Sequence, residues 1–236
     1  MSDLQPLLWC EHDSVEACAR ALSEVVAGDL REAIRVRAKG TLALSGGSTP
    51  APFLRHLASR ELDWTRVEIF LVDERWCSHK DARSNYRMIS RALAGGAARS
   101  ARLVPQWRPD VSLADGATMA CAEFGQVAPL DVLVLGMGTD GHTASWIPGA
   151  AGLRAAMEDT VNAMVPVRPT DGRESRLTMS RAMVSRAHIR YLHITGAAKR
   201  RVLNEALTPG SWEEFPIRGA FAGSTLRVYW GPEDET

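Results

Sequence analysis

The sequence predicts an α/β fold in which helices cover both faces of a doubly wound, mostly parallel β-sheet. Short runs rich in Val, Ile and Leu alternate along the chain with segments of helical periodicity. Each apolar run ends at Gly, Pro, Asp or other polar residues, which is typical of strands buried on both faces. Of the 236 residues, 45% are hydrophobic, enough to bury one core, so we expect a single domain over residues 1–236.

The individual elements follow from the spacing of apolar residues. Residues 14–38 have helical spacing and Ser14 as a candidate N-cap, so they predict a long amphipathic helix. The alternation then continues: strands are expected at 41–45, 67–72, 130–135, 161–167, 188–194 and 226–230, and helices at 50–60, 84–94, 112–125, 143–147 and 197–207. Ligands collect beyond the carboxyl ends of parallel strands, so the residues after each strand are the first functional candidates.

Composition argues against several classes of partner. The 28 basic and 28 acidic residues balance, so net charge gives no reason to expect nucleic acid or an anionic membrane as a partner. The four cysteines are scattered and lack metal-ligand spacing, as expected in a reducing compartment. There is no basic leader and no apolar run of membrane-spanning length. We expect a cytoplasmic protein, a monomer or a homodimer, without bound metal.

A glycine-rich turn follows the first predicted strand. In Ser45-Gly46-Gly47-Ser48-Thr49-Pro50, two glycines allow a tight turn, while Thr49 and Pro50 suit the N-cap and first turn of a helix. Free backbone N–H groups at that helix start could hold a phosphate. An ordinary strand-to-helix turn has the same composition, so this segment alone leaves both interpretations open.

Charged residues come at the end of the second predicted strand, in Asp73-Glu74-Arg75-Trp76. This fold class holds reactive groups at strand tips, although a solvated loop with a local Glu–Arg pair is an equal alternative. Two later cations, Arg176 and Lys199, also lie next to predicted elements: Arg176 leads an apolar-alternating stretch, and Lys199 follows the strand at 188–194. Because a cation near a helix start opposes the helix dipole, Lys199 in the first turn of the helix at 197–207 is better explained by a bound anion.

A second glycine-rich turn, Gly136-Met137-Gly138-Thr139-Asp140-Gly141-His142, follows the strand at 130–135. It matches the Gly-x-Gly-x-x-Gly pattern of dinucleotide sites. We reject that interpretation because the turn lies past mid-chain, the following helix is cut short by a Pro-Gly pair, and the acids about 20 residues on precede the next strand. Instead, Asp140 could orient His142, whose imidazole could work as a general base.

The other histidines are His12, His56, His79, His188 and His193. They show no metal-ligand spacing, and none is expected to be catalytic. The chain has no Gly-x-Ser-x-Gly elbow to present a serine nucleophile. Attack by water therefore fits better than an acyl-enzyme mechanism.

Taken in order, six motifs resemble the 6-phosphogluconolactonases across nearly the whole chain: Ser-Gly-Gly-Ser-Thr-Pro, Asp-Glu-Arg-Trp, Ser84-Asn85, Gly-Met-Gly-Thr-Asp-Gly-His-Thr-Ala-Ser, Arg-Leu-Thr and Thr-Gly-x-x-Lys. The resemblance implies a Rossmann-like fold of the sugar-phosphate isomerase/lactonase type. It also implies hydrolysis of a phosphorylated sugar lactone, 6-phospho-D-glucono-1,5-lactone, in the oxidative pentose phosphate pathway without a cofactor.

The resemblance further implies roles for individual residues. His142 would take a proton from water with Asp140 beside it, and Arg75 would position the lactone or stabilise charge on its carbonyl oxygen. Asp73 joins this catalytic set. The phosphate end would be lined by Gly46, Gly47, Ser48, Thr49, Arg176 and Lys199, with Arg168 as an alternative to Arg176.

Two other functions compete with this one. Glucosamine-6-phosphate deaminases share the fold and the Asp-Gly-His turn, but carry a glutamate five residues after the histidine, where this chain has Ile147. A sugar-phosphate sensor is the second alternative. Related regulators place a helix-turn-helix ahead of the sensor domain, whereas here the first long helix is expected from about residue 14 and the first strand at 41.

Overall fold

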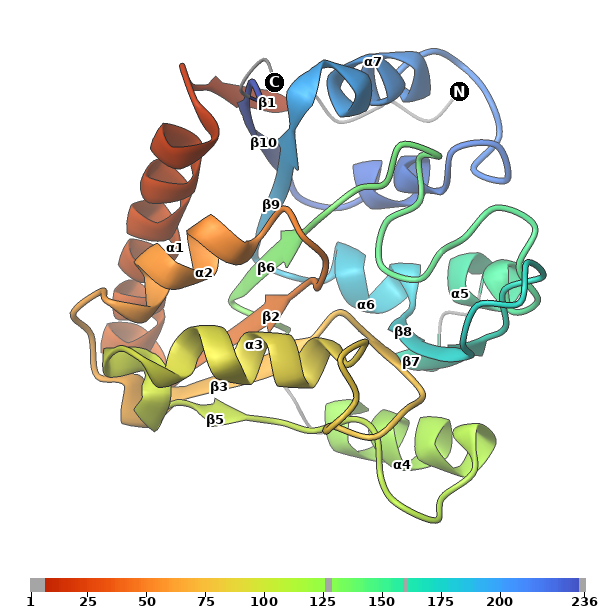
Figure 1. Ribbon diagram of the computed structural model, residues 1–236, viewed down its shortest axis with the longest axis horizontal. Coiled ribbons are helices and arrows are strands. Elements are labelled where there is room, and N and C mark those ends of the chain that lie inside the picture. The colour runs from red at the N-terminus through yellow and green to blue at the C-terminus, as the bar shows by residue number, and fades with distance from the viewer. Residues whose placement is uncertain (1–6, 126–128, 159–160, 234–236) are drawn as a thin grey trace.

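The computed structural model describes residues 7–125, 129–158 and 161–233, so the first six residues, where we expect no leader, lie outside it. Its centre is a seven-stranded sheet in the order β1-β10-β9-β6-β2-β3-β5, with neighbouring strands parallel throughout (Figure 1). The strands are β1 Leu8–Glu11, β2 Gly40–Leu44, β3 Val67–Leu71, β5 Arg102–Leu103, β6 Val132–Leu135, β9 Ile189–Thr195 and β10 Leu226–Gly231. The predicted α/β fold is confirmed.

Helices cover both faces of this sheet because side chains alternate along each strand. In β2, Leu42 and Leu44 join the apolar cluster under one helical layer, and Ala43 joins the cluster under the other. The first layer contains α1 Val15–Arg37, α2 Ala51–Ala58 and α3 Asn85–Ala94. The second contains α4 Leu113–Gly125, α5 Leu153–Glu158, α6 Arg181–Ser185 and α7 Gly196–Ala206. In the described part of the chain, no helix is long and apolar enough to cross a membrane.

A second, antiparallel sheet extends the second layer, with the order β4-β8-β7 (β4 Asp73–Arg75, β8 Arg176–Met179, β7 Met164–Val167). The strand expected at 161–167 therefore starts later and lies outside the parallel sheet. Apolar periodicity cannot distinguish these two places, because both bury the strand.

The helix expected at 143–147 is absent, and this prediction was wrong. The segment is a tight turn closed by a bridge between Thr143 and Trp146, and Ala144 has a left-handed backbone with φ of 52°. The indole N–H of Trp146 donates to the carbonyl oxygen of Met179 at 2.8 Å. The tryptophan is fully buried, so packing against β8 outweighs the local helical pattern.

A fully buried carboxylate, Glu74 on β4, holds α3 against the sheet. It accepts hydrogen bonds from the Ser84 hydroxyl at 2.9 Å and from the backbone N–H groups of Arg75, Asn85 and Tyr86, each at 2.8 Å. Burial raises the pKa of Glu74, and these four donors oppose that shift. Glu74 thus satisfies the free N–H groups at the start of α3, while Ser84 also caps that helix.

Replacing Glu74 should destabilise the fold. We expect Glu74→Ala to lower the free energy of unfolding by roughly 2–4 kcal/mol, because four donors lose a buried acceptor. Urea denaturation measures the change. The control is Glu213→Ala, which removes an exposed partner of Arg154 and should cost less than about 1 kcal/mol. Equal effects of the two substitutions would contradict the role of Glu74.

Candidate active site

Four strands of the parallel sheet end side by side. Leu44 of β2 lies opposite Leu71 of β3 and near Val134 of β6, and Leu135 of β6 lies opposite Leu192 of β9. The segments after these strands enclose a cavity of about 280 Å³. Among the residues that border it are nine predicted site residues: Gly46, Gly47, Ser48, Thr49, Asp73, Arg75, His142, Arg176 and Lys199. Asp140, the tenth, does not border the cavity but contacts His142.

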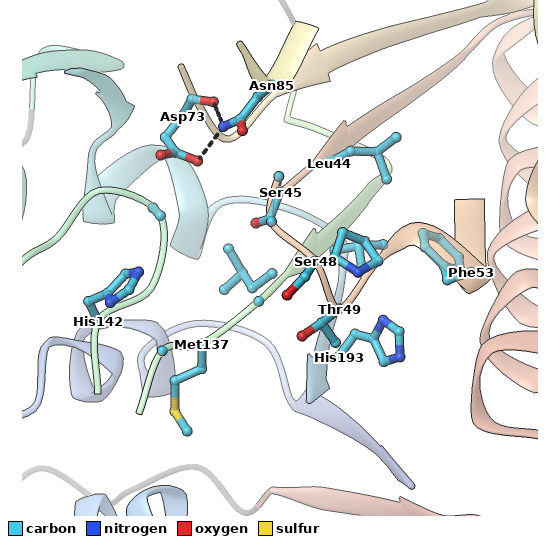
Figure 2. A pocket seen from close by; sticks show the side chains of 18 of the residues that line it. Leu44, Ser45, Ser48, Thr49, Phe53, Asp73, Asn85, Met137, His142 and His193 are labelled. Atoms are coloured by element: carbon cyan, nitrogen blue, oxygen red, sulfur yellow. Dashed lines mark hydrogen bonds between the residues drawn. The ribbon is translucent and has the colours of Figure 1, made fainter. Parts of the chain in front are cut away.

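His142 lies on one side of the cavity (Figure 2), where it is paired with Asp140. The Asp140 Oδ1 atom lies 2.5 Å from His142 Nδ1 and also accepts the His142 backbone N–H at 3.2 Å. Gly138 makes room for this pair, since a Cβ at that position would lie 2.4 Å from the imidazole ring. Gly141 has φ of 76°, so the turn between the two residues also needs glycine.

The charge state of Asp140 determines which imidazole nitrogen carries the proton. Burial is the largest single effect and would raise the pKa of Asp140, but the side-chain hydrogen bond with His142, the charge of His142 and the backbone hydrogen bonds together outweigh it and lower the pKa to about 2. The carboxylate is therefore ionised near neutral pH and can only accept a hydrogen bond. A neutral His142 must then carry its proton on Nδ1, which leaves the lone pair of Nε2 free to accept a proton.

The first glycine turn lies on the other side of the cavity (Figure 2). Gly47 has φ of 103°, and a Cβ on Gly46 would lie 2.0 Å from the side-chain oxygen of Asn85, so both positions require glycine. The expected N-cap role of Thr49 is wrong. Helix α2 begins after Pro50 without a side-chain cap, and the Thr49 hydroxyl instead accepts a hydrogen bond from Lys199 Nζ at 2.7 Å.

Lys199 reaches Thr49 from the first turn of α7. Burial lowers the pKa of Lys199, and the negative charge of Glu233 opposes that shift. Glu233 accepts a hydrogen bond from the Thr195 hydroxyl at 2.8 Å, directly before α7 begins. An acidic side chain thus already lies near this helix start, where negative charge is favourable.

Asp73 and the two predicted arginines meet at the start of the antiparallel sheet. Arg75 and Arg176 are paired across β4 and β8. The buried carboxylate of Asp73 accepts the Ser145 hydroxyl, lies 3.7 Å from an Arg176 nitrogen, and accepts a weak bond of 3.3 Å from the Asn85 amide. Burial lowers the pKa of Arg176, and Asp73 opposes this shift. Asp73 therefore connects the turn after β6 to the cationic side of the cavity.

The cavity also includes residues that the sequence did not single out. Arg173 borders it from an exposed loop, where its Nε donates a hydrogen bond to the Asp171 carboxylate at 2.7 Å. His193, which is not expected to be catalytic, borders it from β9. Nothing in the loop sequence marks Arg173, but the place of His193 near the carboxyl end of a strand was a usable signal. Arg168, the alternative to Arg176, forms an isolated antiparallel β-bridge with Ala151 and is not among the residues bordering the cavity.

Because His193 is buried, we expect the stability of the fold to depend on pH. Burial, and secondarily the charge of Lys199, lowers the pKa of His193 to about 4 from an ordinary value of 6.5. As pH falls from 6.5 towards 4, the unfolded chain takes up a proton that folded His193 does not. The free energy of unfolding should therefore fall over this window. His193 accounts for a loss on the order of 3 kcal/mol once the pH is below its folded pKa.

Urea denaturation between about pH 7 and pH 4.5 tests this contribution. The free energy of unfolding should fall less in His193→Leu than in the unmodified protein, with no contribution from His193 above pH 6.5. Parallel curves for the two proteins would show that His193 does not set this part of the pH dependence.

Fold and site together define an α/β protein with a ligand cavity at the carboxyl edge of a parallel sheet. A histidine that is paired with a carboxylate and several cationic side chains border that cavity. The model of the glucosamine-6-phosphate isomerase/6-phosphogluconolactonase family matches residues 13–230. The chain belongs to this family.

Individual relatives are similar over nearly their full length. A 6-phosphogluconolactonase of Rhizobium meliloti (strain 1021) is 41% identical over 224 residues, covering 93% of this chain and 97% of the relative. One from Pseudomonas aeruginosa is 38% identical, with 91% and 90% covered. The crystal structure of a 6-phosphogluconolactonase from Shewanella baltica OS155 matches with a TM-score of 0.90 and 33% identity, covering 97% of this chain and 99% of that one.

Proposed function

We propose that this protein hydrolyses 6-phospho-D-glucono-1,5-lactone to 6-phospho-D-gluconate, the second step of the oxidative pentose phosphate pathway. The names of its relatives support this substrate. The observation that carries the proposal is the layout of the cavity. His142 borders one side, and the glycine turn borders the other (Figure 2). Asp140 is paired with His142, and Lys199 donates a hydrogen bond to Thr49 of the glycine turn. The lactone likewise has its reactive carbonyl and its phosphate at the two ends of its carbon chain.

In the proposed reaction, His142 Nε2 takes a proton from a water molecule as its oxygen attacks the lactone carbonyl carbon. Asp140 stabilises the resulting imidazolium and keeps the ring oriented. Negative charge develops on the carbonyl oxygen, where the Arg75 guanidinium can stabilise it. The bond from the carbonyl carbon to the ring oxygen then breaks, and the ring oxygen takes up a proton from His142. The products are a free hydroxyl group and a carboxylic acid, which releases its proton to solvent and becomes a carboxylate.

The phosphate would bind at the glycine turn. Its backbone N–H groups and the hydroxyls of Ser48 and Thr49 can donate hydrogen bonds, and Lys199 supplies a point charge. Arg176 would add a second cation from β8. Asp73 supports this end because it holds Arg176 and Asn85, and Asn85 packs against Gly46.

The deaminase alternative lacks an acid at the required position. Residue 147 is an isoleucine that is 3% exposed and packs with Ala150 and Val167. No carboxylate is therefore available there to assist the opening of an amino-sugar ring, which supports the lactonase proposal.

The direct test generates the lactone in place with glucose-6-phosphate dehydrogenase and follows its loss with and without the purified protein. Spontaneous hydrolysis is subtracted. Acceleration by the protein supports the proposed reaction. Binding of 6-phosphogluconate without acceleration would instead support a sugar-phosphate sensor.

Removing the proposed base should abolish most of the activity. We expect His142→Ala to reduce kcat by at least roughly a hundredfold, while the affinity for 6-phosphogluconate stays nearly unchanged. The control is His188→Ala, because His188 is exposed and does not border this cavity. Near-normal turnover of His142→Ala would exclude the general-base role.

Removing the lysine should affect only phosphorylated substrates. Lys199→Met should raise KM for the phosphorylated lactone by roughly tenfold or more, and leave KM for unphosphorylated D-glucono-1,5-lactone nearly unchanged. Lys39→Met is the matched control, since this exposed lysine precedes β2 at the opposite edge of the sheet. The same rise in KM for both lactones would remove Lys199 from the phosphate site.

A further inference from the structure

His193 is a buried histidine inside the cavity wall. It lies near the carboxyl end of β9, opposite Tyr229 of β10, and only 2% of it is exposed. Its ring meets the edge of Phe53 from α2, with the ring centroids 5.9 Å apart and the planes at 69° (Figure 2). Phe53, Thr49 and Lys199 border the same cavity. The imidazole therefore lies at the end of the cavity where the glycine turn and the lysine meet.

Neither ring nitrogen of His193 has a hydrogen-bond partner within the described residues. A neutral imidazole has one donor and one acceptor, and leaving both unpaired in the interior costs stability. An aliphatic side chain of similar size would fill the same space without that cost. Packing alone therefore does not explain a histidine here, and an unpaired buried polar group needs another explanation.

Unpaired buried polar atoms also occur on other residues around this cavity. In the described part of the chain, Ser45 Oγ, Arg75 Nε and Arg176 Nε lack partners, and each of these residues borders the cavity as His193 does. Such a grouping is expected where a polar ligand completes the hydrogen bonding. Arg176 lies beside Asp73, whereas His193 lies near Lys199, which donates a hydrogen bond to Thr49.

An uncharged donor suits the position beside Lys199. A positively charged imidazolium close to this lysine would be repelled by it, whereas a neutral imidazole can donate a hydrogen bond without that repulsion. Burial and the charge of Lys199 both disfavour the imidazolium form of His193. The ligand that uses a lysine, a threonine hydroxyl and a further N–H donor at one point is an oxyanion such as a phosphate group.

We propose that His193 is a phosphate-binding residue whose imidazole N–H donates to a phosphate oxygen held by the glycine turn and Lys199. This inference rests on the proposed function for the identity of the phosphorylated ligand. Both ring nitrogens are covered in the unliganded protein. The phosphate reaches the ring as Lys199 exchanges its hydrogen bond to Thr49 for one to the phosphate.

The test replaces the imidazole with an apolar side chain, in His193→Leu. KM for the phosphorylated lactone should rise about tenfold, while kcat and KM for unphosphorylated D-glucono-1,5-lactone stay unchanged. The melting temperature at pH 7.5 should stay the same or rise, because the variant no longer buries unpaired nitrogens. His193→Gln keeps a side-chain N–H donor and should recover part of the affinity for phosphate.

The matched control is His12→Leu. His12 also has a buried unpaired nitrogen, Nε2, and stacks on Tyr229 with ring centroids 5.6 Å apart, but it does not border the cavity. Its replacement should leave KM for both lactones unchanged. An unchanged KM for the phosphorylated lactone in His193→Leu, or an equal rise for both lactones, would overturn the proposal.

A binding measurement separates this inference from the proposed reaction. Inorganic phosphate should raise the melting temperature of the unmodified protein and of His12→Leu, and raise that of His193→Leu much less. This result would support the role of His193 even if no lactone is hydrolysed. Equal stabilisation of all three proteins by phosphate, or no stabilisation of any, would overturn it.

Discussion

The aligned carboxyl ends of the parallel strands are the constraint on which the rest of this structure depends. Hydrogen bonding between parallel neighbours holds β2, β3, β6 and β9 in register, so the segments that follow them emerge at one edge of the sheet. The strands remain in place because both of their faces are apolar and covered by helices. Residues nearly 100 positions apart, such as Gly46 and His142, therefore border the same cavity.

Two adjacent buried carboxylates join the remaining elements to this edge. Glu74 takes up the free N–H groups at the start of α3, and Asp73 contacts Ser145, Asn85 and Arg176. Burying such groups is costly unless hydrogen bonds satisfy them, and here the partners come from α3, β8 and the turn after β6. The same contacts that offset this cost also fix the position of the cavity walls.

Much of the site could be predicted because its residues directly follow strands. The turns at 45–50 and 136–142 contain glycines that the backbone and close contacts require, and the charged residues after β3 have the same location. His193 was harder to recognise, because its place near the carboxyl end of a strand was the only signal and the apolar strand around it is typical of a packed core. Arg173 gave no signal, since it reaches the cavity from an exposed loop whose path depends on the antiparallel sheet.

The sequence by itself determined the parallel sheet, its helical layers and the two glycine turns, because apolar periodicity and glycine requirements are local properties. Only the tertiary structure decided that β7 joins an antiparallel sheet, that 143–147 forms a turn around buried Trp146, and that Thr49 meets Lys199. These features depend on contacts between residues distant in sequence. The free energies of these contacts exceed the local conformational preferences from which the elements were predicted. No short segment of the chain contains both partners of such a contact, so local patterns cannot reveal it.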